Sequence, residues 1–349
     1  MSKDEGQNPG SASTDGRLIY AVGDIHGRLD LLDRLLGLIL DDLGHRKLAP
    51  PPMIVFVGDY VDRGPASRGV VQRLLALRAS DTLEVRTLKG NHEQAMLQFL
   101  GDAARGPEWV SYGGGATLSS YGVPPPALDA DDAAWEAARQ AFAAAIPEAH
   151  LDFLWSLELS VAAGDYLFVH AGVRPDVPLD EQKESDLLWI RDDFLSAPGP
   201  FGKVVVHGHT PREEAFVGPC RIGLDTGASM TGVLTAVRLG DGEPALIQTL
   251  FAPRPAEPAF RPDRVARLKG AVGDALNRRA MIAAARKAEA DTDAVAGAES
   301  SADVPAKTSQ KSAVAELAEI MIPSLRRSAA LAALLVLSFV VLIYSFAVN

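Results

Sequence analysis

Short apolar runs alternate with longer segments of helical periodicity through the first third of the chain. The runs are rich in β-branched residues and leucine, which is typical of strands, and they cover 18–22, 53–57 and 83–88. Each run is followed by a segment with helical spacing of apolar residues. These segments cover 29–43, 67–78 and a stretch that begins near His92. The alternation of strand and helix predicts an α/β domain.

The second half of the pattern is richer in strands. Strand-like runs recur with few helical segments between them, at 166–170, 204–207, 222–224 and 233–238. Residues 103–160 interrupt the order with three glycines at 113–115, three prolines at 124–126 and an alanine-rich helix around 131–145. We therefore expect a small helical insertion over one face of a fold built from β-sheets flanked by helices.

Composition divides the chain into four parts. Residues 1–15 are polar and carry no apolar segment of a signal peptide, so we expect a disordered N-terminus. The globular domain then covers 16–252. An alanine-rich, charged linker follows over 253–327, with a candidate basic helix at 264–290 that is either solvated or in contact with anionic lipid. The last part, 328–348, is apolar.

The apolar C-terminal segment has the properties of a membrane anchor. No charged residue occurs in the 22 residues from Ser328 to Asn349. As a helix, such a segment is about 33 Å long, enough for a hydrocarbon core of about 30 Å. Arg326 and Arg327 precede it, and the positive-inside rule then places the globular domain on the cytoplasmic side. We expect a single-pass, tail-anchored protein of the cell membrane.

The net charge argues against nucleic-acid binding, and the cysteine content excludes cysteine-based structures. Residues 1–252 hold 21 Lys and Arg against 35 Asp and Glu, and the whole chain has a net charge of −11. An acidic domain of this kind is not expected to bind a nucleic-acid polymer. Cys220 is the single cysteine, so the chain has no disulfide framework and no cysteine-based zinc site.

Metal-binding residue types are concentrated in five short, glycine-containing segments. Five of the seven histidines lie in Gly23–Gly27, Gly58–Gly64, Gly90–Glu93, His170–Gly172 and His207–Thr210. The first three segments each follow a predicted strand and precede a helix, at the edge of an α/β sheet where ligands bind. Carboxylate, imidazole and amide groups without thiolate suit Mn²⁺, Fe or Zn²⁺. The set exceeds the needs of one ion, so we expect two divalent ions that share a carboxylate, as in enzymes that cleave phosphate esters.

These motifs resemble those of a known family. Gly-Asp-x-His-Gly, Gly-Asp-x-Val-Asp-Arg-Gly and Gly-Asn-His-Glu, in this order, are similar to the motifs of the phosphoprotein phosphatase family of metallophosphoesterases. The similarity is closest to bacterial and phage-type serine/threonine protein phosphatases, which share further motifs that here occupy 113–115, 188–191, 208–211 and 225–228. The resemblance covers roughly 17–250 and implies a calcineurin-like sandwich of β-sheets flanked by helices.

The resemblance also implies metal ligands. Asp24 and His26 would bind the first ion, Asp59 would bridge both, and Asn91, His170 and His209 would bind the second. His207 is an alternative to His209, but the family uses the histidine directly after the glycine. Two divalent ions are implied, with Mn²⁺ preferred over Fe or Zn²⁺.

The catalytic roles follow from the same resemblance. A hydroxide that bridges the two metals would attack phosphorus, and His92 would act as the general acid for the leaving oxygen. Asp62 would orient His92, and Arg63 and Arg191 would bind the phosphate. The implied activity is that of a metal-dependent phosphomonoesterase, a serine/threonine phosphatase that acts on phosphoproteins. The apolar C-terminal segment, which lies outside the resemblance, would tether this enzyme to the membrane.

Two other functions are compatible with the motifs. Symmetric dinucleoside tetraphosphate hydrolases resemble this family closely, but they tend to lack the aspartate at position 62 and to carry aspartate at position 93. Asp62 and Glu93 therefore favour the protein phosphatase. An inactive fold used as a membrane-bound recognition module would predict an incomplete ligand set, and every expected ligand is present in the sequence.

Overall fold

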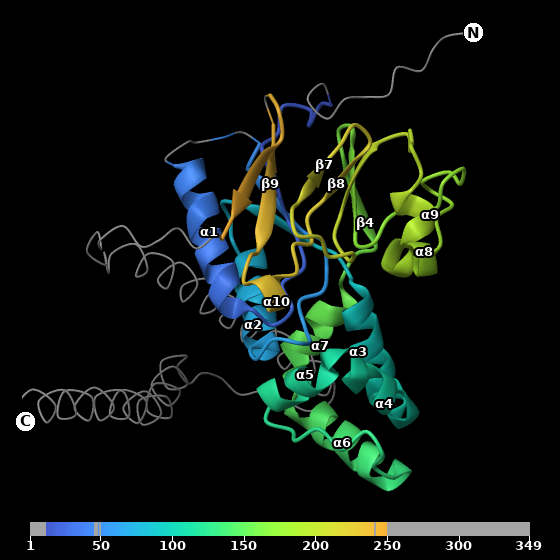
Figure 1. Ribbon diagram of the computed structural model, residues 1–349. Helices are drawn as coiled ribbons and strands as arrows, with labels where there is room; N and C mark the ends of the chain where they lie inside the picture. The colour runs from blue at the N-terminus through green and yellow to red at the C-terminus, as the bar shows by residue number, and fades with distance from the viewer. Residues whose placement is uncertain (1–11, 45–47, 49, 241, 250–349) are drawn as a thin grey trace, which may run out of the picture. The chain divides into compact units, whose positions relative to one another are not determined.

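The computed structural model describes residues 12–249 except 45–47, 49 and 241 (Figure 1). The predicted linker at 253–327, its candidate helix at 264–290 and the predicted membrane segment at 328–348 lie outside the described residues. Within the described part, no helix has both the length and the apolar character needed to cross a membrane.

A mixed five-stranded sheet carries the first three sequence motifs. Its strand order is β10-β9-β1-β2-β3. The strands are β1 (Ile19–Val22), β2 (Met53–Phe56), β3 (Glu84–Thr87), β9 (Thr235–Leu239) and β10 (Ala245–Gln248). β1, β2 and β3 are parallel, whereas β9 and β10 are antiparallel to their neighbours. The carboxyl ends of the three parallel strands therefore lie at one edge of the sheet.

A second five-stranded sheet carries the later histidine motifs. Its order is β4-β5-β6-β8-β7. The strands are β4 (Ser160–Ala163), β5 (Tyr166–Val169), β6 (Val204–His207), β7 (Phe216–Val217) and β8 (Arg221–Gly223). β5, β6 and β8 are parallel, and the two edge strands β4 and β7 are antiparallel. The expected sheets flanked by helices are confirmed.

Alternation of side chains explains why the central strands are apolar on both faces. In β1, Ile19 and Ala21 join a core with Phe168 of the second sheet, so the two sheets pack face to face. Tyr20 and Val22 point to the opposite face and pack against helices. A strand covered on both faces needs a continuous apolar run, as the sequence shows at 18–22.

Helices cover the outer faces of both sheets. On the first sheet these include α1 (Leu29–Leu43), α2 (Ser67–Arg78) and α3 (Asn91–Gly101). On the second they are α8 (Glu184–Trp189) and α9 (Asp192–Leu195), which contribute Leu187 and Phe194 to a smaller core. A four-residue helix, α10 (Ala228–Thr231), lies between β8 and β9. The predicted bounds of the first two helices agree with the structure.

The segment between α3 and β4 forms the expected helical insertion. It consists of a 3₁₀ turn (Ala103–Arg105), α4 (Gly106–Trp109), a π-helical turn (Val110–Gly114), α5 (Gly115–Ser120), α6 (Asp132–Ala145) and α7 (Glu148–Trp155). Figure 1 shows these helices gathered beyond one end of the sheets. Phe99 of α3 joins them to the domain, because its ring stacks on Trp109 and contacts Trp135 and Phe142.

Two features differ from the sequence-based expectations. The edge strands β4, β7 and β10 were not expected, because they are short and partly exposed and so lack a continuous apolar run. The structure also describes residues 12–15, which were expected to be disordered. Ala12 and Thr14 are buried, and the backbone N–H of Ser13 donates to Asp165 Oδ2 at 2.8 Å. Contact with the turn between β4 and β5 holds residues 12–15 in place.

Candidate active site

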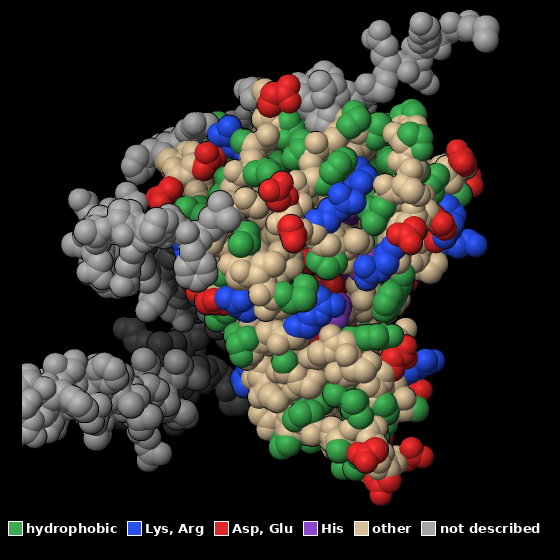
Figure 2. Space-filling view, viewed as in Figure 1, with side chains coloured by type: hydrophobic (Ala, Val, Ile, Leu, Met, Phe, Trp, Pro, Cys, Tyr) green, Lys and Arg blue, Asp and Glu red, His purple; other side chains and the backbone are tan. Residues whose placement is uncertain are grey.

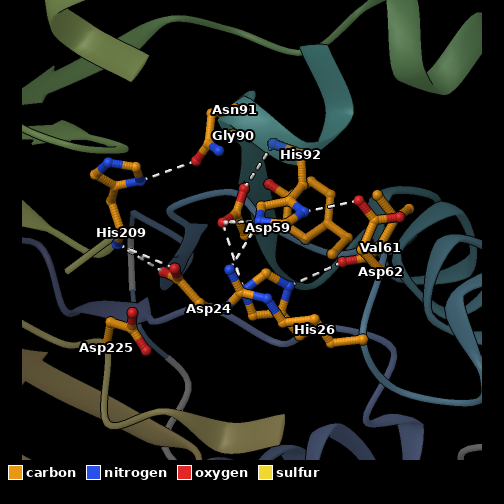
Figure 3. Close-up of polar contacts among 12 residues, drawn as sticks. Asp24, His26, Asp59, Val61, Asp62, Gly90, Asn91, His92, His209 and Asp225 are labelled. Carbon is orange, nitrogen blue, oxygen red and sulfur yellow. Dashed lines mark hydrogen bonds and ion pairs between the residues drawn. The ribbon is translucent and has the colours of Figure 1, made fainter. Parts of the chain in front are cut away.

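Loops at the ends of five strands carry the predicted site residues except Arg191, which lies between α8 and α9. Figure 3 labels several of these residues and shows how they face one another. Asp24 and His26 follow β1, and Asp59, Asp62 and Arg63 follow β2. Asn91 and His92 begin α3, which follows β3, while His170 follows β5 and His209 follows β6. The site therefore draws on both sheets. No single segment of the chain carries enough of these groups to form it alone.

The backbone of these loops is unusual. Of the seven non-glycine residues with positive φ among the described residues, five are predicted site residues. They are His26, Asp59, Asp62, Arg63 and His209, with φ between 47° and 71°. Such conformations are unfavourable for residues with a side chain and persist only when surrounding contacts enforce them. Contacts between these loops and the surrounding residues must therefore hold the backbone in this conformation.

Glu93 supplies one such set of contacts. Its fully buried carboxylate accepts four backbone N–H groups, from Asp59 (2.9 Å), Tyr60 (2.8 Å), Val61 (3.2 Å) and Gly90 (2.9 Å). Burial, with a smaller effect of the Asp59 charge, raises the pKa of Glu93 to about 7. In the sequence, Glu93 served only to distinguish protein phosphatases from dinucleoside tetraphosphate hydrolases. In the structure it fixes the loop that carries Asp59.

Glycines allow the loops to approach one another closely. A Cβ atom on Gly90 would lie 2.1 Å from Asp59 Oδ1, and one on Gly208 would lie 2.0 Å from Asp24 Oδ1. Any side chain at either position would displace a carboxylate of the site. This explains the glycine that precedes Asn91 and the one that precedes His209.

One group of potential metal ligands surrounds Asn91. Atoms of Asp59, His170 and His209 lie within 4.8 Å of one another, and all three residues are buried. Asn91 Oδ1 lies 2.8 Å from His170 Nε2 and 2.9 Å from His209 Nδ1. The four residues predicted to bind the second ion are thus brought together.

The second group differs in one member from the predicted set. His26 and Asp59 lie together with His92, again within 4.8 Å. Asp24 instead faces the His209 loop, where its carboxylate oxygens accept the backbone N–H of His209 at 3.2 and 3.0 Å. Both ring nitrogens of His92 already have protein contacts. His26 Nε2, by contrast, is buried without a hydrogen-bond partner.

His207 belongs to neither group. Its ring contacts the backbone oxygen of Gly208 at 3.1 Å and Arg221 Nη1 at 3.4 Å. Of the two histidines that flank Gly208, the structure places His209 among the ligand candidates and His207 in the packing behind them.

The tautomers of two histidines fit bound cations. His26 Nδ1 lies 2.9 Å from the carbonyl of Val61, and His170 Nδ1 lies 3.0 Å from that of Val57. Because a carbonyl only accepts, both Nδ1 atoms carry the proton and both Nε2 atoms present a lone pair. These lone pairs face Asp59 Oδ2 at 3.5 Å and Asn91 Oδ1 at 2.8 Å, which are acceptors as well.

A divalent cation is bound by lone pairs. A site in which acceptor atoms face one another and the imidazoles are neutral therefore suits it. Burial lowers the pKa of His26 to about 3 and that of His209 to about 2, and it also lowers the pKa of His170. His209 Nε2, like His26 Nε2, is buried without a partner. The donor atoms are nitrogen and oxygen with no thiolate, so the residues fit hard or borderline divalent ions such as Mn²⁺.

Two further carboxyl groups, Asp24 and Asp225, are buried at the site, where their charged forms need a cation nearby. Burial, followed by the charges of Asp225 and Asp59, raises the pKa of Asp24 well above its usual range. Burial also raises the pKa of Asp225 to about 6. Asp225 was not a predicted site residue, although its motif at 225–228 carries part of the family resemblance. Its own turn holds it, because Oδ1 accepts the N–H of Gly227 at 2.8 Å. Accumulated buried carboxylates favour cation binding.

His92 has a different environment from the other histidines of the site. Its Nδ1 lies 2.7 Å from Asp62 Oδ2. Burial lowers the pKa of His92, but the charges of Asp59 and Asp62 and the Asp62 hydrogen bond outweigh this effect, so the pKa is raised. His92 Nε2 lies 3.1 Å from Arg63 Nη2. Because a guanidinium only donates, Nε2 accepts in this contact, and the ring proton bonded to Asp62 lies on Nδ1.

Asp62 is itself held by side chains that the sequence did not identify. It is fully buried, and its oxygens accept Trp109 Nε1 at 2.9 Å and Thr117 Oγ1 at 2.6 Å. Trp109 was not among the predicted site residues. The signal that could have found it is the need of a buried carboxylate for several donors.

Arginines and aromatic rings form the rim. Arg63 is exposed, and its backbone N–H donates to the Gly113 carbonyl at 3.1 Å. Arg191 is exposed as well, and its charge adds to the effect of burial on the pKa of His170. The rings of Trp189 and Tyr112 lie 6.2 Å from His209 and 6.4 Å from His92, respectively. Figure 2 shows histidine surface between basic side chains on this face.

Comparison with known proteins agrees with this geometry. Residues 17–232 match the family model described as calcineurin-like phosphoesterase. The chain belongs to the calcineurin-like phosphoesterase family. It is therefore a hydrolase of the metallophosphoesterase type, in which two divalent metals are bound. The predicted relation to phosphoprotein phosphatases is confirmed at the level of this family.

The names of relatives of this calcineurin-like phosphoesterase refer to different substrates. Serine/threonine-protein phosphatase 1 of Salmonella typhimurium is 29% identical over 64% of this chain and 92% of its own length. Bis(5'-nucleosyl)-tetraphosphatase PrpE [asymmetrical] of Geobacillus thermodenitrificans is 29% identical over 63% of this chain and 89% of its own. A symmetrical bis(5'-nucleosyl)-tetraphosphatase of a Janthinobacterium species is 30% identical over 45% of this chain and 44% of its own.

Proposed function

We propose that this phosphoesterase is a serine/threonine protein phosphatase that releases phosphate from phosphoproteins. The observation that carries the proposal is the His92–Asp62 pair beside the Asp59 ligand groups. A phosphoserine or phosphothreonine ester has a poor leaving oxygen and needs a proton at that oxygen. The phosphatase name of the Salmonella relative supports the same substrate class.

The proposed chemistry assigns each residue a task. Asp24, His26 and Asp59 would hold one divalent ion, and Asp59, Asn91, His170 and His209 the other, with Mn²⁺ the first choice. When bound, the two ions neutralise phosphate charge and lower the pKa of a water that attacks phosphorus. Arg63 and Arg191 bind phosphate oxygens from the rim. His92 would donate a proton from Nε2 to the leaving oxygen once Arg63, which contacts Nε2 in this structure, binds phosphate instead. Asp62 would stabilise the protonated ring through its contact with Nδ1.

The second candidate is hydrolysis of a dinucleoside tetraphosphate, in its symmetric form. The name of the Janthinobacterium relative, a symmetrical bis(5'-nucleosyl)-tetraphosphatase, supports it. The Geobacillus relative is named an asymmetrical enzyme and supports only the dinucleoside tetraphosphate as substrate class. Asp62 and Glu93 favour the protein phosphatase, because the dinucleoside hydrolases tend to differ at both positions. In that alternative the same residues would act on a phosphoanhydride, whose leaving group needs less help from His92.

We also propose that the phosphatase is tethered to the cell membrane by 328–348, with its domain facing the cytoplasm. The support is the uncharged segment from Ser328 to Asn349 and the preceding Arg326 and Arg327. This proposal predicts that the full chain stays with membranes after a carbonate wash. Release of the full chain into the supernatant would contradict it.

A direct assay separates the two substrates. The full chain in mild detergent is stripped of metal, supplied with Mn²⁺ and given a phosphothreonine peptide or diadenosine tetraphosphate. Faster turnover of the peptide, with its loss in His92→Asn, is the expected result. Faster cleavage of the dinucleotide would replace the protein phosphatase by the second candidate.

A further inference from the structure

Four hydrogen bonds converge on the Asp62 carboxylate and backbone from the helical insertion and from His92. Asp62 Oδ2 accepts His92 Nδ1 and Trp109 Nε1, and Oδ1 accepts Thr117 Oγ1. The backbone N–H of Asp62 donates to the same Thr117 oxygen at 2.8 Å. Asp62 has φ of 71°, so these contacts hold a backbone conformation that the residue would not favour by itself.

We propose that Trp109 and Thr117 are positioning residues for the general acid, because they aim the Asp62 carboxylate at His92. The inference rests on the proposed phosphomonoesterase function. A buried carboxylate with one ring partner would be free to rotate or to approach Arg63 instead. Two donors from the insertion leave one orientation, in which Oδ2 faces His92 Nδ1 at 2.7 Å. Through these two side chains the helical insertion acts on catalysis by way of Asp62 and His92.

Thr117 is itself fixed on both sides. Its hydroxyl contacts Ser67 Oγ at 3.0 Å, and Ser67 also accepts the Asp62 N–H at 3.1 Å. Both Thr117 and Ser67 are fully buried. The hydroxyl has one proton, and the 2.6 Å distance to Asp62 Oδ1 places that proton on the carboxylate. Valine at this position would keep the volume and remove the hydrogen bond.

The insertion contains a matched control for Trp109. Trp109 and Trp135 are both buried, and both rings contact Phe99, at 5.1 and 6.4 Å between centroids. Trp109 Nε1 donates to Asp62, whereas Trp135 Nε1 is buried without a partner. Phenylalanine removes the indole N–H and a similar volume at each position. A difference between the two variants therefore reports the hydrogen bond and not the packing.

A comparison of two esters, one with a good and one with a poor leaving group, distinguishes damage to the general acid from general structural damage. An ester with a good leaving group, such as 2,4-dinitrophenyl phosphate, leaves without a proton. A phosphothreonine peptide does not. Damage to the acid therefore lowers turnover of the peptide and spares the dinitrophenyl ester, whereas damage to metal or phosphate binding lowers both.

The experiment compares the full chain with Trp109→Phe, Thr117→Val and Trp135→Phe on both esters with Mn²⁺. We expect Trp109→Phe and Thr117→Val each to lower kcat on the peptide about tenfold, the effect of one lost charge-assisted hydrogen bond. Their kcat on the dinitrophenyl ester and their KM values should change less than about twofold. Trp135→Phe should match the unaltered chain on both esters, and Thr117→Ser should restore the peptide rate.

Three outcomes would overturn the inference. They are an equal loss on both esters, an equal loss in Trp135→Phe, and no loss in either positioning variant when melting temperatures show all variants folded. A second measurement is independent of turnover. In the metal-stripped protein, the His92 Nδ1 proton bonded to Asp62 should give a downfield NMR resonance that Trp109→Phe and Thr117→Val shift or broaden, and that Trp135→Phe leaves unchanged.

This second readout separates the inference from the proposed function. If the unaltered chain hydrolyses neither ester, the proposed function fails, and the NMR resonance alone decides whether Trp109 and Thr117 position Asp62. An unchanged resonance in both variants would refute the positioning role even if the chain proves to be an active phosphatase.

Discussion

The two sides of the active site use the same residue type for opposite purposes. On the ligand side, His26, His170 and His209 are buried and their pKa values are lowered, so they are neutral. On the acid side, His92 is buried too, yet its pKa is raised by Asp59 and Asp62. The difference lies in the partner of Nδ1: a neutral backbone carbonyl for His26 and His170, and a carboxylate for His92. A hydrogen-bond partner thus selects between a metal ligand and a proton donor.

The largest effect should come from removing the residue that both sides share. Asp59 belongs to both ligand groups, and its backbone and side chain also contact Glu93 and His92. Asp59→Asn should lower turnover on the order of 10⁴-fold and reduce bound Mn²⁺, because both ions lose a charged ligand. Metal analysis and phosphate release measure the two effects. Full metal content in an inactive variant would show that Asp59 does not bridge the ions.

A variant of His92 changes the acid side alone and leaves the metal ligands in place. His92→Asn should lower turnover of a phosphothreonine peptide by about 10²–10⁴-fold, the usual contribution of a general acid. Its Mn²⁺ content should equal that of the unaltered chain, because the ligand side stays intact. If this variant instead loses metal, His92 is a ligand, and the group of His26, Asp59 and His92 would be a true coordination shell.

The raised pKa of His92 sets the direction of the pH dependence. The acid works only while Nε2 carries a proton, so turnover of the peptide should be full below the pKa and fall about tenfold per pH unit above it. Because the pKa is raised from 6.5, this decline should begin above that pH. Rate profiles of the unaltered chain and His92→Asn test this. A decline that persists in the variant would belong to another group.

A smaller effect is expected from replacing Glu93, whose carboxylate holds the loop that carries Asp59. Glu93→Gln would turn an amide toward some of the four N–H groups that the carboxylate accepts. We expect a loss of about 1–3 kcal/mol in stability, and Mn²⁺ binding that is about 10–100-fold weaker. Thermal unfolding and metal titration measure both. Wild-type values for both quantities would mean that the loop conformation does not depend on Glu93.

The smallest effect on turnover should come from removing the proposed membrane anchor. Removal of 328–349 should leave turnover of a small phosphate ester unchanged within about twofold and release the protein from membranes. Ester assays and membrane fractionation of the shortened chain provide the measurement. A large loss of turnover would show that the C-terminal segment takes part in the catalytic domain.

Much of this site could be predicted from local sequence. Asp24, Asp59 and Asn91 each follow a strand at its carboxyl end, and the topology of parallel strands brings such residues to one edge. The leucines of 29–43 recur at helical spacing and bury one face of α1 as expected. Expectations of this kind succeed because they depend on periodicity and on a few neighbouring residues. The metal ligands, the acid and the phosphate-binding arginines remain predictions, of which Asp59→Asn tests the shared ligand and His92→Asn tests the acid.

Other features depended on contacts between distant segments. The hydroxyl of Thr117 reaches Asp62 across 55 positions of sequence, and Trp109 reaches it across 47. No local pattern shows which tryptophan of the insertion will donate, since Trp135 has the same burial and a similar neighbour. The family resemblance favoured His209 over His207, and the fold supplies the contacts: His209 faces Asn91 while His207 packs beside Arg221.

The sequence by itself determined the strand ends, the glycines that let the loops approach and the kinds of ligand gathered there. The tertiary structure decided which protonation state each histidine takes, because that state depends on burial and on the group placed against Nδ1. It also decided that a helical insertion would hold Asp62. Hydrogen bonds and desolvation act through space over a few ångströms, and the chain order does not contain those distances until the molecule has folded.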